Sequence, residues 1–592
     1  MTGDGPRVAN VVLDSPLPRL DHPFDYRIPE ALAADVRPGV RVRVPLRVAG
    51  RTADGYVVDV AHESAAPGEL SDLERVVSPV PVLAPEVWRL ARAVADRSAG
   101  VASDVLRIAV PKRQARVEKR WLADGPARAP AVPGDVPAVS EALVAGGRFA
   151  ALATPRALEV GGEAVGGWAV ELAEAAAGVA AAGRTAIVAV PDRRDLEQLA
   201  RALAAGPAAE AVLRVDAAQT APDRYRAHLA ALAPGPHIVI GNRSAVYAPA
   251  AELGALFVWE DADPFHAEPL APYAGTRDVA LLRQEQSGAG LLFLSHSRST
   301  PVQRLVQIGW LGERPSGRYR PDVVLTPDDG RDARIPSAAW RAARAALNSG
   351  PVLVQVARPG DAALQALGTG QPAPPIDAGR TVHELGRAFP GVPVLLADGE
   401  HVHEQVDASP RLVVATRGAE PLALGGYRAV LLLDGRRMLA RESLWVAEDC
   451  LRWWAACAAL SAPGAPVHLV GVTGDVATAL ATWRSPDFAA RQLVDRRALG
   501  FPPAVRLVAV SGPGAPVEEL VEELTAAGAA PIGRTEERGG ERVTLRFDYA
   551  AGPRLAAIAK AAVIRRGSAR RPKPPAPPPP ALRVRFDPHE PV

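Results

Sequence analysis

A glycine-rich stretch, TPRALEVGGEAVGGW at Thr154–Trp168, has the composition of a turn that wraps phosphates. It precedes an alanine-rich segment of helical character and then an apolar run that is typical of a buried strand. A Walker-type loop, G-x-x-x-x-G-K-[ST], needs a lysine after its last glycine to neutralise the phosphates and a hydroxyl to hold Mg²⁺. None of the four lysines of the chain follows a glycine. The sequence therefore contains no such loop. A surface turn is the favoured interpretation, and the alternative is an anion nest, which the negative charge of Glu163 disfavours.

A second apolar run ends in acidic residues, in WEDAD at Trp259–Asp263. Carboxylates at the carboxyl end of a parallel strand can hold Mg²⁺ and orient an attacking water. Glu260, Asp261 and Asp263 are the candidates for such a site, and the alternative is a solvated strand end. Without a phosphate loop we expect at most a degenerate nucleotide and Mg²⁺ site. We predict no catalytic residue, no cofactor and no resident metal.

Other chemical motifs are weak or missing. The sequence holds neither the G-x-S-x-G nor the H-E-x-x-H pattern, and His401 and His403 are expected in an exposed turn. Cys450 and Cys457 are expected as buried apolar side chains of one helix, since two cysteines cannot build a disulfide framework. The N-terminus has no apolar core of signal-peptide length, and no uninterrupted apolar run reaches a membrane span, so we expect a cytoplasmic protein.

The bulk composition is that of a soluble multidomain protein. The chain has 592 residues, of which 48% are hydrophobic and 23% charged, and this length is too great for a single core. The formal net charge is only +2. Contact with nucleic acid would therefore have to come from local basic patches.

The order of expected elements predicts a multidomain α/β protein. Short valine-rich strands and a closing helix form a small β-rich domain at 1–110, and an Arg- and Pro-rich segment at 111–140 is predicted as a linker. Apolar strands alternate with helices at 141–310 and again at 311–486, which predicts two parallel-sheet lobes. The last region, 487–592, has α+β character and contains a proline-rich loop at 568–580.

Several blocks of the sequence resemble, in order, the PriA (primosomal protein N′) family of replication restart proteins. VRVRVPLRVAGRTADGYVVDV resembles its 3′-DNA-end-binding domain, and GNRSAVYAP followed by LGALFVWEDAD resembles its GTRSAxFxP and LGLIIIDEEH. RRALGFPPAVRLVAVSG and ALRVRFDPHEP resemble the opening and the ending of its C-terminal domain. The resemblance implies two RecA-like lobes of the superfamily-2 helicase type between these two domains.

The departures from the family pattern fall on its catalytic parts. The TGSGKT phosphate loop is missing, DEEH has become Glu260-Asp261-Ala262-Asp263, and WAACAALS stands in place of QVAGRAGR. The eight-cysteine zinc insertion has shrunk to a short segment, and the winged-helix region is reduced to the 111–140 linker. Joint loss of the loop, the zinc ligands and the arginine fingers indicates loss of ATP-driven unwinding.

The positions that match the DNA-binding domain of the family remain. The resemblance implies that Phe24, Asp25, Tyr26 and Arg75 hold a 3′ end, although alternation alone places Phe24 and Tyr26 on one core face. Arg41, Arg43 and Arg47 lie on one strand face, as a phosphate-tracking stripe or as a solvated face, and Arg243 is a candidate contact on the first lobe.

We therefore expect a DNA-binding scaffold that recognises abandoned forks and helps to reload the replicative helicase. The resemblance implies forked or single-stranded DNA with 3′ ends as ligand. It implies primosome proteins, the helicase-loading machinery and single-stranded-DNA-binding protein as candidate partners, and no membrane. One alternative is a working 3′→5′ helicase with degenerate motifs. The other is a protein-interaction scaffold that no longer binds DNA.

Overall fold

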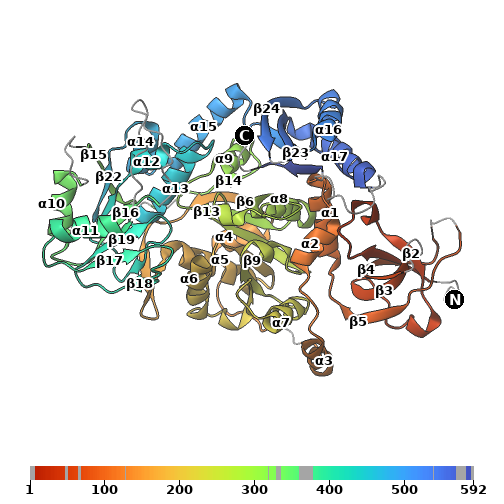
Figure 1. Cartoon of the computed structure of the whole chain (residues 1–592). Coiled ribbons are helices and arrows are strands. Elements are labelled where there is room, and N and C mark those ends of the chain that lie inside the picture. Colours follow the sequence, from red (N-terminus) through yellow and green to blue (C-terminus); the bar gives the residue numbers. More distant parts are fainter. Residues whose placement is uncertain are drawn as a thin grey trace.

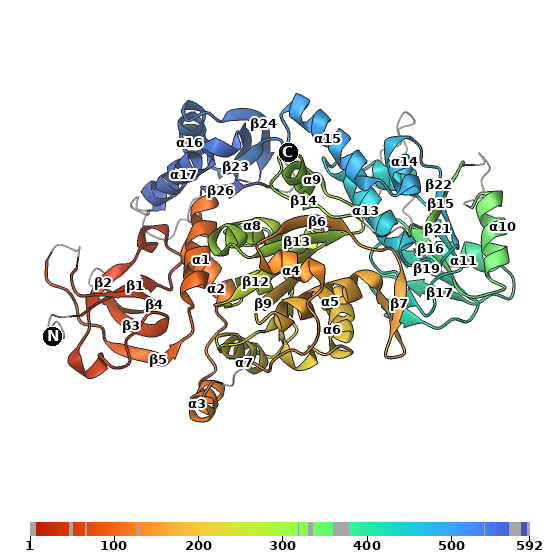
Figure 2. The same ribbon diagram turned by 180° about the vertical axis from the view of Figure 1, so that it is seen from behind.

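The computed structural model describes residues 7–46, 51–64, 68–126, 129–315, 317, 319–328, 335–358, 378–537, 539–567 and 582–588. Figure 1 shows an elongated molecule in which the N-terminal β domain and the second lobe lie at opposite ends. The first lobe lies between them, and the C-terminal domain packs along one side of it, as the view from behind also shows (Figure 2). The predicted order of a β domain, two parallel-sheet lobes and an α+β domain is confirmed. Among the described residues no helix is both long and apolar enough to span a membrane.

The N-terminal domain is an antiparallel five-stranded sheet with the order β2-β1-β4-β3-β5. Its strands are β1 (Val8–Leu13), β2 (Phe24–Arg27), β3 (Val40–Leu46), β4 (Arg51–Ala61) and β5 (Arg75–Pro81). Alternation in β3 sends Val40, Val42 and Val44 into the core. A bridge between Arg27 and Asp72 joins the end of β2 to the segment before β5. The two edges of the sheet therefore meet, as in a small barrel.

Helices connect this domain to the first lobe. Amphipathic helix α1 (Pro85–Arg97) turns Val87, Leu90 and Val94 into the core and packs on α8 of the first lobe and α17 of the C-terminal domain; α2 (Ala102–Ala109) follows it. The 111–140 segment, which we predict as a linker, contains helix α3 (Ala115–Asp124) and the start of α4 (Ala138–Val144).

The first lobe has a seven-stranded sheet in the order β10-β11-β9-β12-β13-β6-β14. All its pairings are parallel, as the continuous apolar runs of its strands predict. The strands are β6 (Arg148–Leu152), β9 (Thr185–Ala189), β10 (Val212–Val215), β11 (Ile238–Gly241), β12 (Leu253–Trp259), β13 (Gly290–Ser295) and β14 (Gly312–Glu313). The helices are α5 (Gly167–Ala181), α6 (Arg193–Ala204), α7 (Ala221–Ala231), α8 (Thr276–Ser287) and α9 (Thr300–Gln307).

The second lobe has a parallel six-stranded sheet in the order β15-β22-β21-β16-β19-β17. Its strands are β15 (Asp322–Thr326), β16 (Val352–Val356), β17 (Val394–Ala397), β19 (Leu412–Thr416), β21 (Ala429–Leu432) and β22 (Pro466–Val470). Its helices are α10 (Ser337–Ala346), α11 (Ala378–Ala388), α12 (Gly435–Leu439), α13 (Val446–Ala458) and α14 (Gly474–Thr482). A short pair, β18 (Gln405–Val406) and β20 (Leu422–Ala423), adjoins the sheet. Cys450 and Cys457 are buried in α13, as predicted.

The C-terminal domain follows helix α15 (Ser485–Leu499), which packs on α9 and α14. Its antiparallel sheet has the order β24-β25-β23-β26 and is covered by α16 (Gly514–Ala526) and α17 (Gly552–Gly567). The strands are β23 (Arg506–Gly512), β24 (Ala530–Glu537), β25 (Gly540–Phe547) and β26 (Arg583–Phe586). The predicted proline-rich loop at 568–580 lies outside the described residues.

Candidate nucleotide cleft and DNA-end site

The glycine-rich stretch forms a β-hairpin rather than a phosphate loop. β7 (Ala157–Val160) pairs with β8 (Glu163–Gly166), and Gly161 and Gly162 make the turn with φ of 61° and 83°. Positive φ at both turn positions suits glycine and is the geometry of a tight hairpin. The expected surface turn is therefore the tip of a two-stranded element that leads directly into α5.

Two tryptophans fill the space between the hairpin and the sheet. Trp168, the second residue of α5, stacks on Trp259, the last residue of β12, with ring centroids 4.3 Å apart and planes inclined by 9°. Their exposed fractions are 3% and 2%. The Trp259 indole Nε1 donates to Asp195 of α6 at 3.1 Å, and the His296 ring meets the Trp259 ring edge-on with centroids 4.9 Å apart. Large rings thus occupy the N-terminal end of α5, where helix geometry would otherwise favour an anion.

The backbone N–H groups at this helix start are also engaged. Gly166 donates its N–H to the Gln198 side chain at 2.8 Å, and Gly167 donates to the Arg156 carbonyl at 2.7 Å. A phosphate cradle needs such N–H groups free to point at the ligand. Here the protein itself satisfies them.

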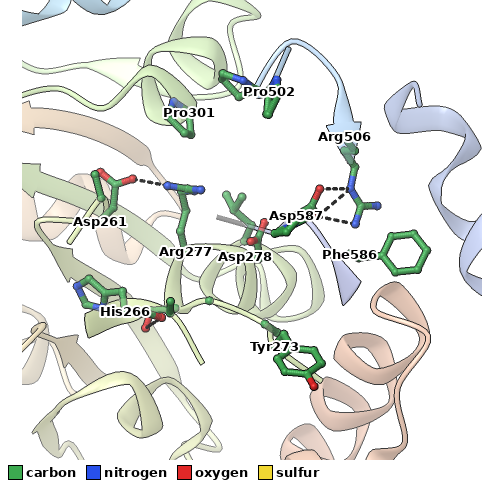
Figure 3. Close-up of a pocket in the computed structure, with 18 of the residues that line it drawn as sticks. Asp261, His266, Tyr273, Arg277, Asp278, Pro301, Pro502, Arg506, Phe586 and Asp587 are labelled. Carbon is green, nitrogen blue, oxygen red and sulfur yellow. Dashed lines mark hydrogen bonds and ion pairs between the residues drawn. The ribbon is translucent and has the colours of Figure 1, made fainter. Parts of the chain in front are cut away.

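The three acidic residues after β12 are bound by other side chains or backbone. Glu260, at a left-handed φ of 49°, accepts from the His296 N–H at 2.8 Å, and its other carboxylate oxygen has no hydrogen-bond partner among the described residues. Asp261 pairs with Arg277 of α8 at 2.9 Å and accepts from the Ser299 hydroxyl at 2.9 Å (Figure 3). Asp263 pairs with Arg452 of α13 at 2.7 Å. Arginine charge therefore stands where a divalent cation would be needed.

Arg452 reaches across from the second lobe to make this pair. It is 6% exposed and lies on the helix that carries WAACAALS, in the region where the PriA pattern has its arginine fingers. Its guanidinium pairs with the Asp263 carboxylate of the first lobe and thereby neutralises that negative charge. Within the described part of the chain, no group of three or more His, Cys, Asp or Glu side chains could hold a metal ion. His401 and His403 therefore belong to no such group.

The hairpin and α6 hold the two lobes together through a set of contacts that we call the interlobe clasp, comprising Ala164, Arg194 and Arg201 of the first lobe and Glu404, Gln405, Gly418 and Glu420 of the second. The Ala164 N–H donates to the Gln405 side chain at 2.8 Å, and Arg201 pairs with Glu404 at 2.9 Å. Arg194 donates to the Gly418 carbonyl at 2.9 Å and also to the Glu420 carbonyl. The clasp joins the two lobes on the side on which the hairpin lies.

A cavity of about 220 Å³ lies where the two lobes, α1 and the C-terminal domain meet (Figure 3). Asp261, Arg277 and Tyr273 line it from the first lobe, while Arg506 and Asp587 line it from the C-terminal domain. Arg506 and Asp587 form an ion pair at 2.7 Å, so the walls of this cavity are largely charge-balanced. The stacked tryptophans do not belong to the described residues that line it.

The resemblance to the PriA family assigns four N-terminal residues to a 3′-end site. Three of them are exposed or partly buried, and one lies in the core. The Asp25 carboxylate accepts from Asn10 and Ser64, each at 2.6 Å, and is partly buried on the outer face of β2. Phe24 is partly buried and meets the exposed His22 ring at a centroid distance of 4.2 Å. Arg75 is exposed at the start of β5, three residues after the Arg27–Asp72 bridge that joins it to the β2 edge.

Tyr26 lies in the core of the domain instead. Its ring is 5% exposed, and its hydroxyl donates to the Pro45 carbonyl at 3.2 Å. Burial raises the pKa of this phenol. The ring face is therefore not available for stacking on a base, which agrees with the core position that alternation alone predicts for this residue.

The predicted arginines are mostly engaged within the protein. Arg41 donates to the Tyr56 hydroxyl at 2.9 Å and to the Pro111 carbonyl at 3.3 Å, while Arg43 pairs with Asp54 at 2.8 Å. Arg243 pairs with Glu268 at 2.9 Å. Arg47 lies outside the described residues.

Reasoning from the sequence missed Trp168, Trp259 and the two residues that hold Asp25. The signals were available only in part: a tryptophan directly after a glycine pair at a helix start, and another directly before an acidic cluster. Their mutual contact joins residues 91 positions apart, which no local pattern reveals.

Comparison with known proteins shows which family this chain resembles. Residues 10–111 match the family described as 3'DNA-binding domain (3'BD), and residues 497–589 match the primosomal protein N C-terminal domain. The chain is 41% identical over 572 residues to the probable replication restart protein PriA of Mycobacterium tuberculosis strain H37Rv, covering 86% of this chain and 87% of that protein. It is 39% identical over 574 residues to the probable PriA of Mycobacterium leprae, covering 86% and 88%.

Solved structures give a weaker likeness. RecG bound to a three-way DNA junction has 12% identity and a TM-score of 0.37, covering 69% of this chain and 52% of that one. The DExH-box NTPase HrpB of E. coli has 16% identity and a TM-score of 0.32, covering 62% and 44%.

Proposed function

Because this chain belongs to the family of replication restart proteins PriA, we propose that it recognises abandoned replication forks through a 3′ DNA end and acts without hydrolysing ATP. In this role it is a scaffold. It binds the fork and presents a fixed surface to the proteins that reload the replicative helicase.

One observation carries the claim that ATP is not used: the stacked pair Trp168–Trp259 occupies the start of α5, where phosphates would bind. A nucleotide would have to displace two buried rings and also compete with the protein groups that already satisfy the N–H donors. Burying an indole contributes several kcal/mol, and a phosphate without lysine lacks a charge-assisted contact of about 1.5–3 kcal/mol.

The ion pairs of Asp261 and Asp263 support the same conclusion. Each carboxylate has an arginine within 2.9 Å or less, so Mg²⁺ would have to break a buried ion pair before it could bind. Breaking a buried pair by loss of one partner costs about 3–5 kcal/mol.

The DNA-binding half of the proposal rests on the N-terminal domain. Asp25, Phe24 and Arg75 lie on the joined β2 and β5 edges and offer a carboxylate, an aromatic edge and an exposed cation. A carboxylate can accept from a sugar 3′-hydroxyl or a base edge, and a guanidinium can meet phosphate. His22 adds a second exposed ring beside Phe24.

Fluorescence anisotropy with a labelled fork tests this proposal. We expect tighter binding to a fork that has a 3′ end at the branch than to a blunt duplex of the same length. At a constant concentration of free Mg²⁺ and constant ionic strength, we expect no change in affinity when ATP is added. The double variant Asp25→Ala/Arg75→Ala should lose the preference. A matched control, Arg484→Ala/Asp487→Ala, removes an exposed ion pair on α15 and should retain it.

Two results would refute the assignment. Equal affinity for the fork and the blunt duplex, or an unchanged preference in the Asp25→Ala/Arg75→Ala variant, would contradict the 3′-end site. Absence of binding to any DNA would leave a protein-interaction scaffold instead.

A further inference from the structure

Helix α3 carries an unusual concentration of positive charge. The segment from Pro111 to Pro126 holds five basic residues and two acidic ones, a net charge of +3, whereas the net charge of the whole chain is +2. It also holds two of the four lysines of the chain, Lys112 and Lys119. Figures 1 and 2 both show α3 projecting beyond the first lobe, below α7.

One face of α3 anchors it to the first lobe. Val117 and Trp121 pack against the cluster that contains Tyr225 of α7. Glu118 is 1% exposed, and it accepts from the Tyr225 hydroxyl at 2.6 Å and from Arg113 at 2.7 Å. Burial by itself raises the pKa of the Glu118 carboxyl, but the hydrogen bonds from Arg113 and Tyr225 outweigh it and hold the pKa below its usual range. The helix is therefore fixed in place, and Arg113 is engaged in fixing it.

The opposite face is basic and open. Lys112, Arg116 and Lys119 are exposed, and no ion pair joins them to any residue that the structure describes. Arg120 is exposed as well and pairs with Asp124 at 3.4 Å, a contact worth little in solvent. Arg116, Lys119 and Arg120 are spaced i, i+3 and i+4, so they share one side of the helix.

This basic face is held next to the N-terminal domain. Arg41 of β3 donates to the Pro111 carbonyl at 3.3 Å, directly before Lys112. The segment is thus tied at one end to the domain that resembles a DNA-end site and at the other end to α7.

The geometry points to the outer face of α3, with Arg116 and Lys119, and to Lys112 in the segment that leads into the helix, as a binding site for the phosphate backbone of duplex DNA adjoining the 3′ end. This inference rests on the proposed DNA-binding function and adds a second contact region to it. Duplex DNA presents a charge every ~1.7 Å along its axis, so a row of fixed cations gains affinity by releasing counterions, without regard to base sequence.

The salt dependence of fork binding tests the inference. The variant Lys112→Ala/Arg116→Ala/Lys119→Ala is compared with the charge-retaining control Lys112→Arg/Arg116→Lys/Lys119→Arg, on forks that carry the same 3′ end and either a long or a short duplex arm. All three side chains are exposed, so the thermal unfolding temperature should be unchanged in both variants.

On the long-arm fork we expect the alanine variant to bind on the order of tenfold more weakly at low salt, and the slope of log K against log salt to fall by about 2 to 3. The control should match the wild type, and the short-arm fork should show a smaller loss. The effect should be the same for unrelated duplex sequences.

An unchanged affinity and salt slope in the alanine variant, with a wild type that binds the fork, would overturn this inference and leave the proposed function intact. If the wild type bound no DNA, both would fail. If the substitution weakened binding of poly-L-glutamate and left DNA binding unchanged, α3 would be a surface for an acidic protein instead, and the inference would again be overturned.

Discussion

At the scale of single residues, Trp168 decides what the first lobe can bind. Its ring lies flat on Trp259 and is almost fully buried, so it belongs to the core as much as to the cleft. In the proposed function this side chain excludes a nucleotide, and its burial also contributes to stability.

Replacing Trp168 by alanine should test both roles. We expect the free energy of unfolding to fall by about 3–5 kcal/mol, because a large buried ring is lost and a cavity remains. We also expect no ATP hydrolysis to appear, because the lysine and the free carboxylates are still missing. Chemical denaturation and a phosphate-release assay measure the two outcomes, and turnover in this variant would contradict the account.

The buried Asp195 carboxyl makes the stability of the fold depend on pH. Burial, followed by the nearby Asp192 and Asp263 carboxylates, raises the pKa of Asp195 well above its ordinary value of 3.8. A raised carboxyl pKa in the folded state means that stability is fully present at low pH and is lost as pH rises through the folded pKa.

The variant Asp195→Asn should therefore be more stable than the wild type near neutral pH. The difference in unfolding temperature should shrink as the pH falls and should vanish below the ordinary value of 3.8, where the wild-type carboxyl is protonated in both states. Calorimetry across this pH range measures it. A wild type that is the more stable protein at neutral pH would count against the raised pKa.

Some of this residue-scale picture is predictable from the sequence. The absence of a lysine after any glycine excludes a phosphate loop without any structure, and the burial of Cys450 and Cys457 follows from their apolar helix. The tryptophan stack and the arginine partners of Asp261 and Asp263 could not be predicted, because each contact joins distant parts of the chain.

At the scale of elements, the β7–β8 hairpin explains how the lobes keep their arrangement without a nucleotide. Its β8 strand lies against β20 of the second lobe, and the Ala164 N–H is held by Gln405. In a nucleotide-driven enzyme this cleft opens and closes with ligand. Here backbone and side-chain contacts of the interlobe clasp connect the two lobes directly.

Hydrogen exchange at the hairpin should report on the clasp. Gln405→Ala removes the acceptor of the Ala164 N–H and should speed exchange at β8, whereas Gln405→Glu keeps an acceptor and should slow it again toward the wild-type rate. Addition of Mg²⁺ and ATP should change neither pattern. Equal exchange in the alanine and wild-type proteins would show that the clasp does not hold the hairpin.

The elements themselves were predicted unevenly. Most strands of both lobes follow from their apolar runs, as expected for parallel strands covered on both faces, whereas β6, β14 and β15 were not predicted. Helix α3 lies within a segment predicted as a linker, because its buried side consists only of Val117, Glu118 and Trp121, and a buried glutamate breaks the expected apolar stripe.

At the scale of the whole molecule, a buried carboxylate joins three regions that are far apart in the sequence. The Asp21 side chain is 1% exposed and pairs with Arg92 of α1 at 2.7 Å and with Lys560 of α17. It also accepts from the Ala102 N–H at 2.8 Å. The N-terminal domain is thereby connected to the C-terminal domain across α1.

Substituting Asp21→Asn should weaken this connection. The two cations would lose their buried partner, which costs about 3–5 kcal/mol, and the unfolding temperature should fall. The matched control Asp96→Asn removes a 59%-exposed partner of Arg92 and should cost less than about 1 kcal/mol. Equal unfolding temperatures for the two variants would argue against a role for Asp21 in joining the domains.

The central claim is that the molecule binds forks without using ATP, and DNA-stimulated ATP hydrolysis tests it most directly. Purified protein is incubated with Mg²⁺, ATP and a fork that carries a 3′ end, at a DNA concentration that saturates binding. The account predicts phosphate release no faster than in the absence of protein. Release that requires the fork and disappears in the Asp261→Ala variant would contradict it.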